Sequence, residues 1–366
     1  MKQLNTKLVL DFVPKRGNPR NSEGAFIRDK DGTILFAYSQ YFGNDWHDHQ
    51  PSNIALIRSH DEGETWSEPE IIATAEELNA SNLMSVSAIY QADGKIGIYF
   101  LAKLFDDGKS EGLHSILCRV IISDGIHFAA ERCGFRAPKG YYIFNNDRLV
   151  RLSDGRLVYP AGYMDRPRHL LSTVFISQDD GASFYKHEMM LDLPFDNLLG
   201  LQEPGILEHQ DGRLRLWMRT NMGYQYECYS YDHLKTFSVP IPSEFTSPCS
   251  PMEMEYGPDG TLYAIYNPIP TYNGRVCSHA SHHGRNPLII RKSTDDGKTW
   301  GDCYIIEADE DRGFCYPAMC FTNDGGLLVS YCRGGTEDGF CLTRLGIRKF
   351  FLKDIENKNA TYEGIV

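Results

Sequence analysis

The 366-residue sequence lacks any apolar stretch approaching the ~18 residues that a membrane-spanning helix requires. It also lacks a run of lysine and arginine, and its 49 acidic residues outnumber its 37 basic ones, for a net charge of −12. These absences argue against nucleic acid and anionic membranes as main partners. The opening segment, MKQLNTKLVLDFVPKRG, has only a short apolar run and no small-residue cleavage site, so a signal peptide is not expected.

The ten cysteines include no CxxC pair and no dense disulfide framework. Several lie inside apolar runs, where free buried thiols are common; these are Cys118, Cys320 and Cys332. Together with the missing signal peptide, this pattern predicts a soluble, cytoplasmic protein with reduced cysteines. No metal or other cofactor is expected, because two groups of potential ligands each lack a recognisable second half. The groups are His47, Asp48 and His49, and Cys277, His279, His282 and His283.

Long helical patterns are missing as well, and the chain instead repeats a tight turn followed by a strand-like run. The turn glycines are Gly32, Gly94, Gly155, Gly212, Gly260 and Gly325, at intervals of 62, 61, 57, 48 and 65 residues. Asp-Gly between two apolar runs is a strong hairpin signal, because the turn requires a positive φ. The sequence therefore predicts six hairpins, one in each of six repeating units.

A second repeat interleaves with the first. Residues 59–66 (SHDEGETW) and 293–300 (STDDGKTW) are complete Ser-x-Asp-x-Gly-x-Thr-Trp boxes, and 177–184 (SQDDGASF) keeps most of the pattern. Decayed copies start at Ser123 and Ser230. In such a box the Asp side chain caps its own turn, Gly supplies the positive φ and the aromatic residue packs between sheets. The boxes are therefore interpreted as folding elements rather than as catalytic groups.

Short strands, a repeat of about 61 residues and one aromatic turn per repeat predict an all-β fold, a six-bladed β-propeller with four-stranded antiparallel blades. Residues 1–366 are expected to form a single domain, because a partial propeller would leave sheet edges uncovered. No box follows Gly325, so the ring is predicted to close by sharing a blade between the two chain ends. The candidate partners are KLVLDF near residue 10 and CLTRLGIRKFF near residue 345.

The repeat also predicts where the site lies. Nine residues before each hairpin glycine stand Glu23, Ser85, Asn146, Glu203, Pro251 and Tyr316. If the blades superpose, these residues share one height near the start of each inner strand, which lines the central channel. Asn146 belongs to a polar run, residues 145–148, that opens the third inner strand and either binds substrate hydroxyls or caps the strand. Two carboxylates, an amide, a hydroxyl and a phenol would then converge on the axis.

The chain resembles the sialidase (neuraminidase) superfamily with its Asp-box repeats. The resemblance rests on the boxes and on LQEPGILEHQDGRLRLWMRT, GRNPLIIRKSTDDGKTW and FCYPAMCFTNDGGLLVSYC, and it covers nearly the whole chain. The family binds a sugar carboxylate with three arginines and attacks the anomeric carbon with a Tyr paired to a Glu. The resemblance implies that Arg219 and Arg285 are the second and third arginines. It likewise implies that Tyr316 is the nucleophile and Glu203 its base.

The residue types suit that chemistry. A guanidinium fork pairs a carboxylate bidentately, so a local cationic cluster would overcome the repulsion from a protein of charge −12. Sialidases are an exception to the two-carboxylate glycosidase scheme and use Tyr as nucleophile. A neutral Tyr316 avoids repulsion from the substrate carboxylate, and Glu203 can take its proton during attack.

The first half of the chain departs from the family pattern. The opening Arg-Ile-Pro is missing, and Arg20 is the best candidate for the first arginine although it lies three residues before the expected register. Glu23 occupies that register and is expected to pair with an arginine or to bind a substrate hydroxyl. The general acid is predicted in the loop before the first box, where Asp48 is preferred and Asp45 is the neighbouring candidate.

These observations predict an exo-glycosidase that hydrolyses a terminal acidic sugar, with a sialic acid glycoside as the default substrate and retention of configuration. The expected partner is a glycan that ends in a carboxylate sugar, and the sequence does not fix the oligomeric state. Two alternatives stay open. One is a propeller hydrolase or lyase for another acidic sugar such as a uronic acid, and the other is a non-catalytic carbohydrate-binding propeller.

Overall fold

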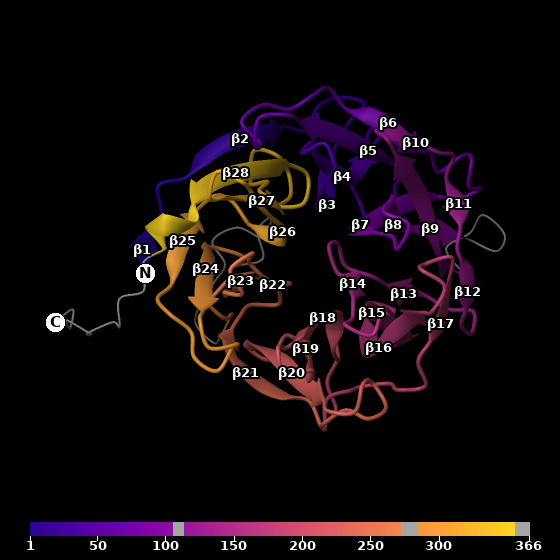
Figure 1. The fold of residues 1–366 in the computed structure, drawn as a ribbon, viewed down its shortest axis with the longest axis vertical. Helices are drawn as coiled ribbons and strands as arrows, with labels where there is room; N and C mark the ends of the chain where they lie inside the picture. Colours follow the sequence, from indigo (N-terminus) through magenta and orange to yellow (C-terminus); the bar gives the residue numbers. More distant parts are fainter. Residues whose placement is uncertain (105–112, 272–283, 356–366) are drawn as a thin grey trace.

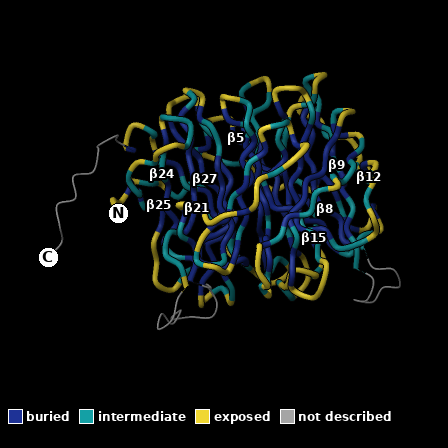
Figure 2. Tube along the Cα trace, turned by 90° about the horizontal axis from the view of Figure 1, so that it is seen from below, coloured by how far each residue is buried: buried dark blue, intermediate teal, exposed yellow. Residues whose placement is uncertain are grey.

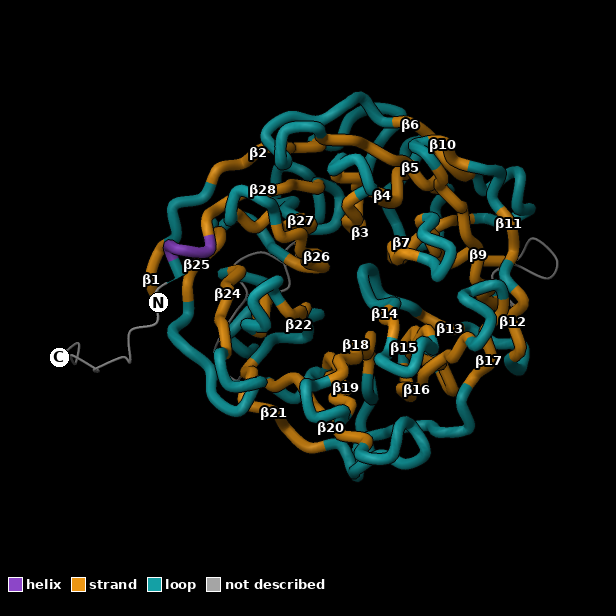
Figure 3. The backbone as a smooth tube through the Cα atoms, viewed as in Figure 1, coloured by secondary structure: helices purple, strands orange, loops and turns teal. Residues whose placement is uncertain are grey.

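The structure is a computed structural model that describes residues 1–104, 113–271 and 284–355. Six small sheets stand around a central axis as the blades of a propeller (Figure 1). In five blades the inner strand comes first in sequence among the antiparallel strands, and the chain then moves outward; in the sixth, the outermost strand comes from the amino-terminal end. Strands and loops make up almost all of the described chain, with one short 3₁₀ helix, η1 (Leu352–Asp354) (Figure 3). No helix in these ranges is long and apolar enough to cross a membrane.

The first three blades are built from residues 21–186. Blade 1 contains β3 (Asn21–Arg28), β4 (Ile34–Tyr41), β5 (Ser52–Ser59) and β6 (Glu70–Ala73). Blade 2 contains β7 (Asn82–Tyr90), β8 (Ile96–Leu104), β9 (His114–Ser123), β10 (Ile126–His127) and β11 (Glu131–Arg132). Blade 3 contains β13 (Tyr142–Ile143), β14 (Val150–Arg151), β15 (Leu157–Arg166), β16 (His169–Ser177), β17 (Ser183–Lys186) and β12 (Gly134–Arg136), which pairs in parallel with β17.

The other three blades complete the ring. Blade 4 contains β18 (Gln202–Glu208), β19 (Leu214–Arg219), β20 (Tyr224–Ser230) and β21 (Ile241–Thr246). Blade 5 contains β22 (Glu253–Tyr256), β23 (Leu262–Tyr266), β24 (Leu288–Ser293), β25 (Tyr304–Glu307) and β1 (Lys2–Gln3), which pairs in parallel with β25. Blade 6 contains β26 (Cys315–Phe321), β27 (Gly326–Cys332), β28 (Leu345–Phe351) and β2 (Lys7–Phe12).

Blade 6 closes the ring as the sequence predicts. The amino-terminal strand β2 pairs antiparallel with β28, so that Lys7 lies opposite Lys349 and Phe12 opposite Leu345. The chain therefore contributes both ends to one sheet, which removes the free edge that an open array would expose. The six hairpin glycines all have a positive φ, between 78° and 95°.

In the complete Asp box at residues 59–66, side-chain hydrogen bonds stabilise the turn. Asp61 Oδ1 accepts hydrogen bonds from the hydroxyl of Ser59 at 2.8 Å and from the backbone N–H of Thr65 at 2.9 Å. Trp66 closes the box and packs against Phe26 and Phe36 of blade 1. The carboxylate is engaged within its own turn, as expected for a folding element.

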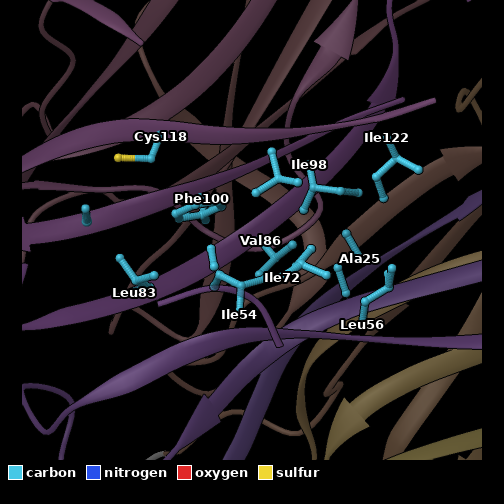
Figure 4. Close-up of a cluster of buried hydrophobic side chains, with 14 of the residues drawn as sticks. Ala25, Ile54, Leu56, Ile72, Leu83, Val86, Ile98, Phe100, Cys118 and Ile122 are labelled. Carbon is cyan, nitrogen blue, oxygen red and sulfur yellow. The ribbon is translucent and has the colours of Figure 1, made fainter. Parts of the chain in front are cut away.

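Hydrophobic side chains fill the space between adjacent blades. The second strand of blade 2, IGIYFLAKL in β8, is apolar along nearly its whole length, because a neighbouring blade covers each of its faces. Figure 4 shows the cluster between blades 1 and 2, where Leu56, Val86 and Phe100 are fully buried. Burying one such side chain stabilises the fold by about 1.5–3 kcal/mol. Exposed residues gather in the loops at the two ends of the ring (Figure 2).

Candidate active site

A β-bulge interrupts the inner strand of four blades at the same height. The pairing register shifts at Ser22/Gly24 in β3, Met84/Ser87 in β7, Gln202/Gly205 in β18 and Cys315/Ala318 in β26. Within the bulges, four residues adopt a left-handed backbone with φ between 44° and 61°; they are Glu23, Ser85, Glu203 and Tyr316. Such a conformation costs about 1–3 kcal/mol for a residue with a side chain, and a bulge re-aims that side chain.

The bulges support the predicted register in these four blades and shift it in a fifth. In blade 3 the left-handed residue is Asp147, one position after the predicted Asn146. Asn146 is fully buried, and its amide nitrogen donates to the carbonyls of Gly24, at 2.9 Å, and Tyr316, at 3.4 Å. This amide of blade 3 therefore reaches across the channel and bridges the adjacent blades 1 and 6. Its binding of substrate hydroxyls stays a prediction.

Tyr316 and Glu203 form the centre of the site. The phenol of Tyr316 donates a hydrogen bond of 2.8 Å to Glu203 Oε1, and the Tyr316 residue is only 9% exposed. Burial, together with the neighbouring carboxylate of Glu203, raises the pKa of Tyr316 well above its usual value. Tyr316 is therefore a neutral phenol at neutral pH, and its proton already points at the group that can accept it.

Arg219 completes this centre from the end of β19. Its Nη1 donates to Glu203 Oε2 at 2.7 Å and to the phenol oxygen of Tyr316 at 3.4 Å. Its Nε donates to the sulfur of Cys249 at 3.2 Å. The guanidinium thus fixes the carboxylate of Glu203 while its fork remains beside the nucleophile.

Arg285 lies on the other side of the phenol, with its guanidinium carbon 5.6 Å from the ring centre of Tyr316. Its nitrogens donate to the sulfur of Cys315 at 3.1 Å and to the carbonyl of Cys249 at 3.3 Å. The residue is 5% exposed, its Nε has no hydrogen-bond partner, and no carboxylate pairs with it within the described ranges. A buried guanidinium without a carboxylate is a preformed site for an anion.

Arg20, the predicted first arginine, is already paired with two carboxylates. Its Nη1 contacts Asp48 Oδ1 at 2.5 Å, and its Nη2 contacts Glu23 Oε1 at 3.1 Å. The same two nitrogens also donate to the carbonyl of Trp46 and the hydroxyl of Ser22, both at 3.2 Å. Arg20 is 1% exposed, and only its Nε lacks a partner. Its completion of an arginine triad stays a prediction, because both outer nitrogens are occupied.

Asp48 and Asp45, the two candidate acids in the loop between β4 and β5, are both stabilised as anions. Partial burial opposes ionisation of Asp48, but Arg20 and Lys103 lower its pKa to about 2. Asp45 is bound to the ring of His47, which lowers its pKa as well, and its side chain is 46% exposed. A general acid requires the opposite shift, so this geometry gives no support to the prediction that Asp48 donates the proton.

Sequence reasoning missed two residues of the site. Lys103 in β8 is 1% exposed and donates from Nζ to the carbonyl of Asp48 at 2.6 Å; burial lowers its pKa to about 8. A lysine near the end of the apolar run IGIYFLAKL was the available signal. Cys249 contacts both Arg219 and Arg285, and nothing in its sequence context indicates that role.

Cys277, His279, His282 and His283, one of the two groups considered as metal ligands, lie outside the described residues. The nine cysteines within the described ranges are all free.

The sequence of this chain is similar to sequences of known proteins. The family model of the BNR repeat-like domain matches residues 107–329, well over half of the chain. The chain belongs to the BNR repeat-like domain family. A sialidase of Micromonospora viridifaciens is 29% identical to this chain over 93 residues, which are 24% of this chain and 13% of that protein. The BNR repeat-like chain thus aligns with only about an eighth of the length of that curated relative.

Solved structures share the propeller over most of this chain. A Dyadobacter fermentans protein of unknown function superposes with a TM-score of 0.70 at 18% identity, covering 94% of this chain and 99% of that one. A Hadza microbial sialidase superposes with a TM-score of 0.73 at 15% identity, covering 93% and 67%. The predicted resemblance to the sialidase superfamily is therefore confirmed for this BNR propeller, and the structural matches show the fold.

Proposed function

We propose that this BNR propeller is an exo-glycosidase that hydrolyses a terminal acidic sugar, with a sialic acid glycoside as the first substrate to test. The observation that carries the proposal is the Tyr316–Glu203 hydrogen bond beside Arg285, a buried guanidinium that pairs with no carboxylate among the described residues. A nucleophile, its base and an anion site then stand within one small space. The similarity to sialidases supports a glycan substrate.

The sugar carboxylate would bind to Arg285 and to the free edge of the Arg219 fork. Each charge-assisted hydrogen bond to a carboxylate contributes about 1.5–3 kcal/mol. Since both guanidiniums flank the phenol of Tyr316, a carboxylate held there places the adjacent anomeric carbon near the phenol oxygen. Positioning of this kind converts attack into an effectively unimolecular step.

In the first step the phenol oxygen of Tyr316 bonds to the anomeric carbon as the glycosidic C–O bond breaks. The phenol proton moves to Glu203 Oε1, along the hydrogen bond already formed. The aglycone departs with the electron pair of the broken bond. Water then attacks the same carbon and loses one proton, which neutralises the departed aglycone, while the Tyr316 oxygen leaves and takes its proton back from Glu203. Two displacements at one carbon give overall retention. A neutral nucleophile suits this substrate, because a carboxylate nucleophile would meet the negative charge of the sugar. No step requires a cofactor.

A second substrate class, another acidic sugar such as a uronic acid, is favoured by one observation. Arg20 is occupied by Asp48 and Glu23, so two arginines rather than three are available to a ligand carboxylate. A site with two available arginines can bind the carboxylate of an acidic sugar other than sialic acid.

The test is release of a fluorescent aryl leaving group from an aryl sialoside by the wild type and by Tyr316→Phe. Release by the wild type and its loss in the variant support the proposal. If the wild type is inactive, aryl uronides are the next substrates. Binding of acidic sugars without turnover of either substrate would favour the carbohydrate-binding alternative and overturn the enzymatic proposal.

A further inference from the structure

Glu23 occupies in blade 1 the position that Glu203 and Tyr316 occupy in blades 4 and 6. All three lie in the bulge of an inner strand, with φ values of 53°, 44° and 57°. Asn146 of blade 3 also bridges the bulges of blades 1 and 6, because its amide nitrogen donates to the carbonyls of Gly24 and Tyr316. The backbone therefore presents a third functional group at the level of the Tyr316–Glu203 pair.

The surroundings of the Glu23 carboxyl leave one oxygen available. Oε1 accepts hydrogen bonds from Arg20 Nη2 at 3.1 Å and from the hydroxyl of Ser22 at 3.5 Å. Both of these bonds end on Oε1, and Oε2 takes part in no hydrogen bond in the part of the chain that the structure describes. The residue is 3% exposed, so bulk water does not solvate this carboxyl freely. Arg20 holds one oxygen in place and leaves the other to carry a proton.

Asp48, the other carboxyl beside Arg20, has a different environment. Its side chain is 57% exposed, it forms the shorter contact with Arg20, and Lys103 holds its backbone carbonyl. Arg20 and Lys103 therefore stabilise Asp48 as an anion, whereas burial raises the pKa of Glu23 to about 7, with Asp48 and Glu203 adding to the effect and Arg20 opposing it. Two carboxyls in contact with one guanidinium thus differ in protonation.

We propose that Glu23 is the general acid and base of this site, and that Asp48 positions Arg20. This assignment rests on the proposed glycosidase function and identifies its missing proton donor. As the Tyr316–carbon bond forms, the proton on Glu23 Oε2 moves to the departing glycosidic oxygen. In the second step the Glu23 carboxylate takes a proton from the attacking water, and the resulting hydroxide oxygen bonds to the anomeric carbon. Glu23 ends protonated, as it began, and Glu203 separately exchanges its proton with Tyr316.

The test compares an aryl and an alkyl glycoside of the same acidic sugar in Glu23→Gln and Asp48→Asn. A phenolate leaves with little acid assistance, whereas an alkoxide needs a proton. Glu23→Gln is therefore expected to lower kcat/KM for the alkyl glycoside by about 10²–10⁴-fold and for the aryl glycoside by less than about 10-fold. Asp48→Asn is expected to lower both by a similar factor. Thermal unfolding of each variant shows whether it is folded.

The pH profile and azide rescue provide a readout that a structural role would not change. The wild type should lose alkyl-glycoside activity as pH rises through about 7, where Glu23 deprotonates, and Glu23→Gln should lack that limb. Azide should increase the rate at which Glu23→Gln turns over the aryl glycoside, because azide attacks the anomeric carbon without losing a proton to a base. A selective alkyl loss in Asp48→Asn, or an equal loss on both substrates in Glu23→Gln, overturns the assignment. A wild type inactive on every aryl glycoside overturns the proposed function itself, and the assignment with it.

Discussion

The phenol of Tyr316 and the carboxylate of Glu203 meet at 2.8 Å although 113 residues separate them in the chain. Each residue occupies the bulge of its inner strand, with a left-handed backbone that directs the side chain toward the axis. The close contact is therefore a consequence of the repeat, because two blades place the same strand position at the same height. Chemistry is then decided by which side chain each blade carries there.

Tyr316→Phe removes the attacking oxygen and leaves the ring packing in place. We expect kcat for an aryl glycoside of an acidic sugar to fall by about 10²–10⁴-fold, since both covalent displacement and proton transfer to Glu203 are lost. Initial rates measured with matched protein concentrations check this. The thermal unfolding midpoint should change by only a few degrees, and full activity in the variant would contradict the nucleophile assignment.

Arg285→Met removes a buried guanidinium that pairs with no carboxylate in the described part of the chain. KM for an anionic substrate should rise about 10–100-fold, corresponding to the loss of about 1.5–3 kcal/mol of charge-assisted hydrogen bonding. The methyl ester of the same substrate should bind wild type and variant with similar affinity. Arg291→Met is the matched control, because Arg291 bonds the carbonyls of Trp300 and Gly301 at an Asp box. Equal effects of the two substitutions would argue against a carboxylate clamp.

Asp61→Ala tests the folding role of the Asp box. Asp61 accepts bonds from Ser59 and from both the backbone and the hydroxyl of Thr65. Its loss should lower the free energy of unfolding by about 1–3 kcal/mol, measured by urea denaturation, with unchanged activity per folded molecule. The exposed Glu76 supplies a control, and Glu76→Ala should stay within about 0.5 kcal/mol. A specific loss of activity in folded Asp61→Ala would contradict a purely structural box.

Glu307 makes part of the stability dependent on pH. Burial opposes its ionisation, but hydrogen bonds from Arg348, Arg333 and Tyr331 lower its pKa from 4.5 to about 2. Because the folded-state pKa lies below the unfolded one, this contribution is present above pH 4.5 and is lost as pH falls toward 2. The 2.5-unit difference corresponds to about 3 kcal/mol.

Urea unfolding of wild type and Glu307→Gln at pH 7 and pH 3 measures this contribution. The variant should be less stable at pH 7 and should lose less stability on acidification. Identical pH slopes in the two proteins would show that Glu307 does not carry the acid sensitivity.

Much of the fold was predictable because its signals are local. Six turn glycines, each with the positive φ that the turn requires, marked the hairpins, and the closing pair of β2 and β28 followed from the missing sixth box. The parallel additions of β1 and β12 were not predictable, since such short edge strands carry no periodic pattern. The shift from Asn146 to Asp147 in blade 3 has the same origin, because counting assumes bulges at equal spacing.

The site divides in a similar way. Glu203, Tyr316 and Arg219 lie on inner and second strands, where repeat register and resemblance agree, and the structure brings them within hydrogen-bond distance. The contact between Arg20 and Asp48 could not be predicted in this way. Asp48 lies in the loop after β4, and the path of this loop is fixed by contacts from other blades. A lysine in the apolar run IGIYFLAKL marks Lys103 as unusual, but the sequence does not show that Lys103 holds this loop, because the lysine belongs to blade 2.

The most direct test of the account is mass spectrometry after incubation with 2,3-difluorosialic acid. Fluorine beside the anomeric carbon slows an oxocarbenium-like transition state, and fluoride leaves without acid help, so the covalent intermediate should accumulate. We predict one sialosyl adduct in the wild type, located on the peptide that contains Tyr316 and absent from Tyr316→Phe. An adduct on Glu203 or any other residue, or no adduct in protein that hydrolyses an aryl sialoside, would contradict the account.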